Sequence, residues 1–156
     1  MVYAPEKYFA GLTARERAQR LRRITAGSKT ASNDPKAYRP FKTDKGKKTK
    51  PSSYTTAFKV SYPGTTSLKN ISLATGIPHD IIKEVYDKGL AAWRTGHRPG
   101  ASQQAWGYAR VHSFVMKGCT YYTADKSLVK EALGRMSESQ KRKWLARKKM
   151  CDKLKK

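Results

Sequence analysis

The sequence predicts an all-α protein: a small helical bundle with a long extended N-terminal arm and a basic C-terminal helix. Apolar residues recur at helical spacing through the middle of the chain, and no segment shows convincing strand alternation. Positive charge gathers at both ends. Residues 1–60 carry 15 Lys/Arg against 4 Asp/Glu, and residues 135–156 carry 10 against 2, while residues 61–134 carry 9 against 5.

Length and charge limit the domain organisation. A chain of 156 residues suits one ordinary domain, and a hydrophobic content of 38% is low for a core that takes in the whole length. The net charge of +23 opposes compaction and favours polyanions or acidic protein surfaces as partners. We therefore expect an extended basic arm with one short helix over residues 1–65, a helical core over 66–134 and a basic C-terminal helix over 135–156.

The N-terminal arm contains one clear helix signal. Thr13 and Glu16 have the spacing of a capping box, so a helix is expected from Ala14 to about Thr25, ended by Gly27. Residues 28–51 are rich in Lys, Thr, Ser and Pro and have no period of 2 or 3.6, so they are expected to be ordered only by a partner. The aromatic residues of the arm are the expected anchors on that partner: Tyr3, Tyr8, Phe9, Tyr38, Phe41, Tyr54 and Phe58.

The remaining helices follow from apolar stripes and end signals. Ser52 or Ser53 is expected to cap a short helix through Phe58, and Gly76 sits where the helix that follows Ser67 would stop. Further helices are expected over about 79–93, 102–117 and 123–133, with Gly134 just past the last of these, and from Ser137 onward.

The stretch from Trp93 to Trp106 predicts a rigid elbow between two helices. Proline restricts itself and the residue before it, and the two glycines at 96 and 100 permit tight turns. The residues that are expected to build this structural elbow are Trp93, His97, Arg98, Pro99 and Trp106. An arginine here can clamp a phosphate or carboxylate, but more often it caps helix carbonyls or stacks on a Trp, and we favour the structural role for Arg98.

The sequence predicts no enzyme, no cofactor and no metal site. His79, His97 and His112 belong to no metal-binding or catalytic motif, and Cys119 and Cys151 are far apart without metal spacing. Two such cysteines favour a reduced, intracellular setting. No apolar run approaches the length of a membrane span.

Residues 68–89 have the outline of a helix-turn-helix, which would place residues 79–88 in a DNA groove. Ser72 stands where a small apolar residue usually packs, Pro78 follows the turn, and the reading helix carries at least as many acidic residues as lysines. We therefore interpret this segment as a structural corner.

Two blocks of sequence resemble a known group of viral proteins. WRTGHRPGASQQAWGYARVHSFVMKG followed by TYYTADKSL is similar to a module in proteins of large DNA viruses of algae and protists and of some tailed phages. YFAGLTARERAQRLRRI and DPKAYRPFKTDKGKKTKPSSYTTAF resemble a segment of small basic virion-associated proteins of these giant viruses. This resemblance implies a virion protein, and it brings no catalytic residues with it.

We therefore expect a minor capsid protein of a large icosahedral double-stranded DNA virus, assembled in the host cytoplasm and lying on the inner face of the capsid. Its extended arm would cement capsomers, with the major capsid protein and other minor capsid proteins as partners. Contact with genomic DNA or with an inner membrane surface stays open, without a membrane span. The alternative is a nucleic-acid-binding protein, either DNA-condensing or helix-turn-helix, and a third possibility is a ribosome-like RNA-binding protein.

Overall fold

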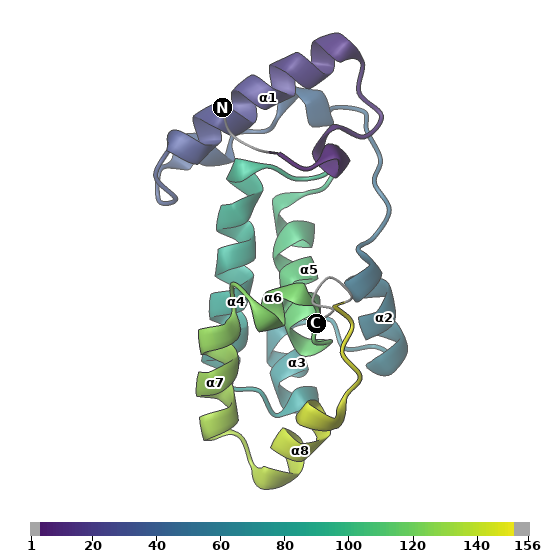
Figure 1. The fold of residues 1–156 in the computed structure, drawn as a ribbon, viewed down its shortest axis with the longest axis vertical. Helices are drawn as coiled ribbons and strands as arrows, with labels where there is room; N and C mark the ends of the chain where they lie inside the picture. The colour runs from purple at the N-terminus through teal and green to yellow at the C-terminus, as the bar shows by residue number, and fades with distance from the viewer. Residues whose placement is uncertain (1–3, 152–156) are drawn as a thin grey trace. The chain divides into compact units, whose positions relative to one another are not determined.

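The computed structural model describes residues 4–151, and every regular element in this range is helical (Figure 1). Contacts divide the chain into two compact units. The first unit comprises the chain up to Lys50 together with Gly89–Trp106, and the second comprises Pro51–Lys88 together with the chain from Gly107 onward. These limits differ from the expected boundaries after residues 65 and 134, because the elbow groups with the N-terminal segment rather than with the helices on either side of it.

The first unit is built on one long helix and short 3-10 turns. Its elements are η1 (Glu6–Phe9), α1 (Ala14–Lys29), η2 (Pro35–Tyr38), η3 (Lys42–Asp44) and η4 (Trp93–Thr95). The Thr13–Glu16 capping box is present in full, as predicted. The helix does not end at Gly27 but continues to Lys29. A side chain at Gly27 would collide with the backbone carbonyl of Arg94, so this glycine serves a close approach of α1 to η4 and not a helix end.

The prediction of an extended arm is wrong for residues 4–50. The two short turns η2 and η3 fold back onto α1, where the Arg23 guanidinium donates hydrogen bonds to the carbonyls of Ala37 and Arg39. Phe41 is 2% exposed and lies under the guanidinium groups of Arg20 and Arg23. Composition suggested disorder because the segment has little apolar content, but its backbone polar groups find partners on the arginines of α1.

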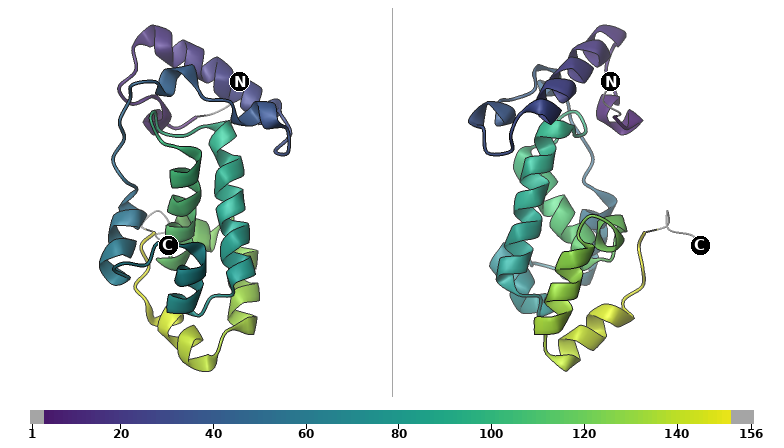
Figure 2. Two further views of the ribbon diagram at one scale, coloured as in Figure 1. Left: turned by 180° about the vertical axis from the view of Figure 1, so that it is seen from behind. Right: turned by 60° about the vertical axis from the view of Figure 1, so that its left-hand side comes forward.

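The second unit contains most of the helices. They are α2 (Ser53–Ser61), α3 (Leu68–Thr75), α4 (His79–Ala92), α5 (Gln103–Val115), α6 (Cys119–Tyr122), α7 (Lys126–Arg135) and α8 (Glu138–Ala146), with the last residues of α4 and the first of α5 belonging to the first unit. Figure 2 shows α4 and α5 side by side and α8 turning back from the end of α7.

Helix ends in this unit largely follow the predicted signals. The side chains of Ser52, Ser67 and Ser137 cap α2, α3 and α8, and Gly76 ends α3 with a φ of 79°. The helix predicted from Thr123 instead begins at Lys126, and it runs through Gly134 to Arg135.

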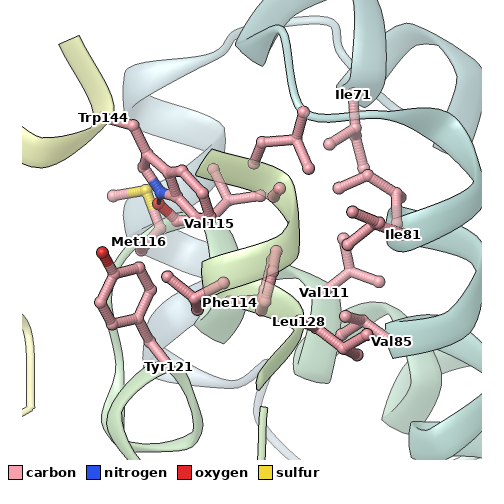
Figure 3. Close-up of a cluster of buried hydrophobic side chains, with 14 of the residues drawn as sticks. Ile71, Ile81, Val85, Val111, Phe114, Val115, Met116, Tyr121, Leu128 and Trp144 are labelled. Atoms are coloured by element: carbon pink, nitrogen blue, oxygen red, sulfur yellow. Dashed lines mark hydrogen bonds between the residues drawn. The ribbon is translucent and has the colours of Figure 1, made fainter. Parts of the chain in front are cut away.

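Fifteen buried residues form the core of the second unit, and they come from all seven helices, the turn between α3 and α4 and the turn after α5. Figure 3 shows Trp144 and Tyr121 converging on Phe114 from one side, while Ile71 and Ile81 approach from the opposite side. The Phe114 and Trp144 ring centroids are 5.4 Å apart, and the Trp144 indole donates a hydrogen bond of 3.0 Å to the carbonyl of Val115. The basic C-terminal helix is therefore fixed to the core by its own tryptophan.

A disulfide joins Cys119 to Cys151, which contradicts the expectation of two separate reduced cysteines. Lys117 brings them together: its carbonyl accepts hydrogen bonds from the backbone N–H groups of Met150 and Cys151. Its ammonium donates to the carbonyls of Leu145 and Arg147 at the end of α8. A separation of 32 residues hides this proximity from a reading of the sequence.

Candidate functional site

A buried polar cluster lies at the centre of the first unit and links α1, η3 and the elbow. Arg20 of α1 is fully buried, and its guanidinium donates to the Asp44 carboxylate at 2.9 Å, to the Thr43 hydroxyl at 2.6 Å and to the backbone carbonyl of His97 at 2.5 Å. Asp44 also accepts the backbone N–H of Gly100 at 3.0 Å. The Asp44 carboxylate therefore joins α1 to the elbow, which lies 53 or more residues further along the chain than Asp44.

The ring of His97 is held at both nitrogens. Nδ1 lies 2.9 Å from the carbonyl of Trp93, and Nε2 lies 2.6 Å from Oδ2 of Asp44. Both ring nitrogens therefore have partners inside the protein, a backbone carbonyl and a carboxylate. Burial raises the pKa of Asp44, but hydrogen bonds from His97 and Gly100 and the charges of His97 and Arg20 outweigh it and lower that pKa below its usual value.

This cluster resembles an Asp–His pair of an active site, but its geometry serves structure. His97 is fully buried, and neither ring nitrogen is open to a substrate. Its ring stacks on Trp93 at 4.3 Å and meets Phe41 edge-on at 4.5 Å. The cluster therefore locks the elbow to the N-terminal segment.

The elbow has the predicted structural role, though not with the predicted arginine. Arg94 caps the end of α4 through the carbonyl of Ala91 and also reaches the carbonyl of Thr30. The side chain of Arg98 is part-buried and has no hydrogen bond or ion pair within residues 4–151. Pro99 is buried, and Trp93 donates from its indole to the carbonyl of Ala101. Trp106 is only partly buried and meets the ring of Tyr8 edge-on, with centroids 6.0 Å apart.

The expected aromatic anchors are covered by the chain itself rather than presented to a partner. Phe9, Phe41 and Phe58 are 8%, 2% and 0% exposed, and Tyr8, Tyr38 and Tyr54 are partly buried. Phe9 and Phe41 belong to the apolar cluster of the first unit, and Phe58 belongs to the core of the second. Tyr3 lies outside the described residues. The low apolar content of the N-terminal segment had suggested that these aromatic side chains would find no apolar neighbours within the chain itself.

His112 is the second buried histidine, and it lies in the second unit. Its Nδ1 is 2.7 Å from the hydroxyl of Thr55, and its ring stacks on Phe58 at 4.4 Å. Burial, with a smaller contribution from the charge of Lys59, lowers the pKa of His112 to about 4. The His112 ring is therefore neutral at physiological pH and packs against the core through Phe58.

The corner between α3 and α4 has the outline of a helix-turn-helix but an unsuitable charge. The Ser72 hydroxyl donates to the carbonyl of Ile77 at 2.6 Å, so the polar residue at this position fastens the turn. The exposed positions of α4 are His79, Asp80, Lys83, Glu84 and Asp87, which hold three acidic residues against one lysine. A phosphate backbone would be repelled by this face.

The exposed surface has few large apolar side chains, and both units carry a large excess of positive charge. The only large apolar side chains exposed among residues 4–151 are Val60, Leu73 and Leu145, all in the second unit at 77%, 71% and 46%. The first unit has 16 Lys/Arg against 4 Asp/Glu, and the second has 18 against 7. Carboxylates are therefore too few to neutralise either unit.

No group of three or more His, Cys, Asp or Glu side chains in residues 4–151 is arranged to hold a metal ion. Over the same residues, no helix combines the length and the apolar character that crossing a membrane requires.

Sequence reasoning missed the residues that organise the first unit, namely Arg20, Asp44 and Arg94. A signal for Arg20 was present, because it precedes Ile24 by four positions and so shares the inward face of α1. Nothing in the sequence indicated that Asp44 would face it, since the two residues are 24 positions apart and the segment after α1 has no periodic pattern.

The comparisons with known proteins give one match. A family described as "Family of unknown function (DUF5824)" matches residues 5–129, which include all of α1 to α6. No curated protein and no solved structure matches the chain.

Proposed function

We propose that this chain, which belongs to the Family of unknown function (DUF5824), is a minor capsid protein of a large icosahedral double-stranded DNA virus. It would bind the major capsid protein and other minor capsid proteins on the inner face of the shell, as a binding protein and not an enzyme. The viral setting comes from the resemblance of its two sequence blocks to small basic virion proteins. The mode of binding differs from the expected one, because residues 4–50 are folded and present a preformed surface.

The observation that carries this proposal is the pairing of exposed apolar side chains with cations. Val60 follows Lys59 in α2, Leu73 lies one turn after Lys69 in α3, and Leu145 lies one turn after Arg142 in α8. All three cations are exposed. Apolar side chains with a cation beside them suit a partner protein with an acidic surface.

The disulfide is a second support. Disulfides persist in oxidising surroundings, which include the surfaces of virions, and are rare in the reducing cytosol. The Cys119–Cys151 bond would therefore form or persist after the particle leaves the cytoplasm of the host.

Binding to emptied shells tests the proposal. Purified shells freed of DNA by nuclease should retain the wild-type protein, and the variant Leu73→Ser/Leu145→Ser should bind clearly more weakly. Ala74→Ser, at an exposed position of the same helix as Leu73, is the matched control and should bind as the wild type does. Release of the wild-type protein together with the DNA would contradict the capsid role.

A nucleic-acid-binding protein is the second candidate. The helix-turn-helix form is disfavoured by the acidic face of α4. A form that condenses DNA is favoured by the first unit, which has an excess of 12 positive charges and no large exposed apolar side chain in its described residues. RNA binding of the ribosomal kind stays a prediction.

A further inference from the structure

The solvent face of α1 is a regular row of cations. Arg15, Arg22 and Lys29 follow one another at intervals of seven residues, which is close to two helical turns, and all three are exposed. The other exposed positions between them are Ala18, Ala26 and Ser28, all with small side chains. With a rise of about 1.5 Å per residue, the row is about 21 Å long. Because the side chains between the cations are small, a partner can contact all three cations at the same time.

The opposite face fixes the direction in which this row points. Arg17 pairs with Glu6 at 2.7 Å, Arg20 pairs with Asp44, and Arg23 binds the carbonyls of the segment after α1. The three remaining basic residues of the helix have no ion pair within residues 4–151. The helix therefore uses half of its cations for its own fold and leaves the other half available, in a fixed geometry, for a ligand.

The composition of the row selects the chemistry of that ligand. A protein partner would usually be held by large apolar or aromatic anchors, and this face has none. A single strand of nucleic acid would need aromatic side chains for base stacking, which are equally absent from the exposed face of α1. The phosphate backbone of a duplex requires only cations at suitable spacing and close approach.

We propose that the Arg15–Arg22–Lys29 face of α1 binds the phosphate backbone of duplex DNA without sequence preference. This inference deepens the second candidate function by naming the surface, and it is compatible with a shell protein whose first unit faces the packaged genome. Each of the three side chains contacts phosphate and displaces condensed counterions.

Fluorescence polarisation with a labelled duplex of about 20 base pairs, or two helical turns, tests the inference. The variant Arg15→Gln/Arg22→Gln/Lys29→Gln is compared with Lys126→Gln/Lys130→Gln/Lys143→Gln, which removes the same charge from exposed positions of α7 and α8. Gln is a good helix former, and unchanged circular dichroism confirms that both variants are folded. The dissociation constant is measured from about 50 to 200 mM salt.

The wild-type protein is expected to bind with a steep salt dependence. In the α1 variant the slope of log K against log salt should fall by about 0.9 for each lost phosphate contact, up to about 2.7, and the control variant should keep the wild-type slope. Equal losses in the two variants would overturn the α1 inference and leave DNA binding by general charge. No binding by the wild-type protein would overturn the second candidate function as well, whereas retention on emptied shells is measured independently.

Discussion

Removing the disulfide is the sharpest test of how the C-terminal segment is held. The Cys119–Cys151 bond closes a loop of 32 residues that contains α6, α7 and α8. In the chain-entropy account, opening a loop of this length costs about 3.7 kcal/mol of stability at 25 °C, because the unfolded chain regains conformations. For a chain of this size the melting temperature should fall by about 7–15 °C.

The assay is urea denaturation followed by tryptophan fluorescence, with and without a reductant. Trp144 reports on this region because its indole is bound to the Val115 carbonyl in the core. The variant Cys119→Ala/Cys151→Ala should unfold at the midpoint of the reduced wild-type protein and should not respond to reductant. The hydrogen bonds of Lys117 remain in both, so the segment should loosen without complete unfolding of the core.

Two results would refute the reasoning. One is an unfolding midpoint of the wild-type protein that does not change on reduction. The other is alkylation of both cysteines in the folded, unreduced protein, which would show that the bond is not formed.

Three further predictions concern buried groups and the backbone. Asp44→Asn removes the carboxylate that pairs with the buried Arg20 guanidinium and binds the buried His97 ring, and it should cost about 3–5 kcal/mol in urea denaturation; a loss below 1 kcal/mol would argue against the lock. The pKa of His112 is lowered to about 4, so the unfolded chain takes up a proton first. This histidine should therefore contribute a loss of stability on the order of 3 kcal/mol as pH drops from 6.5 to 4, and His112→Asn should remove that contribution and leave the smaller one of the carboxyl groups. Gly100→Ala, at a φ of 90° with the new Cβ 2.5 Å from the carbonyl oxygen of Lys47, should lower the melting temperature, whereas Gly134→Ala, with open space around it, should preserve or raise it.

The sequence predicted those features that depend on local signals. The serine caps of α2 and α8, the glycine end of α3 and the turns of the elbow at its two positive-φ glycines are confirmed. Each is determined by a few neighbouring residues, because capping and turn geometry need only short-range hydrogen bonds.

Features that depend on distant residues could not be predicted from the sequence. Arg20 meets Asp44 across 24 residues and the carbonyl of His97 across 77, and Cys119 meets Cys151 across 32. The N-terminal segment appeared too polar to fold, since its stability comes from arginine side chains that satisfy backbone carbonyls rather than from apolar burial alone. A polar network of this kind has no period in the sequence.

The central claim is that residues 4–50 fold on their own chain and present a preformed basic surface before any partner is bound. Hydrogen–deuterium exchange on the free protein tests this claim most directly. We expect the amides of α1, over Ala14–Lys29, to be protected together with those of η3, and Asp44→Asn to speed their exchange while the core of the second unit is unaffected. Complete exchange of α1 in the free wild-type protein, with protection gained only on adding shells or duplex DNA, would contradict it.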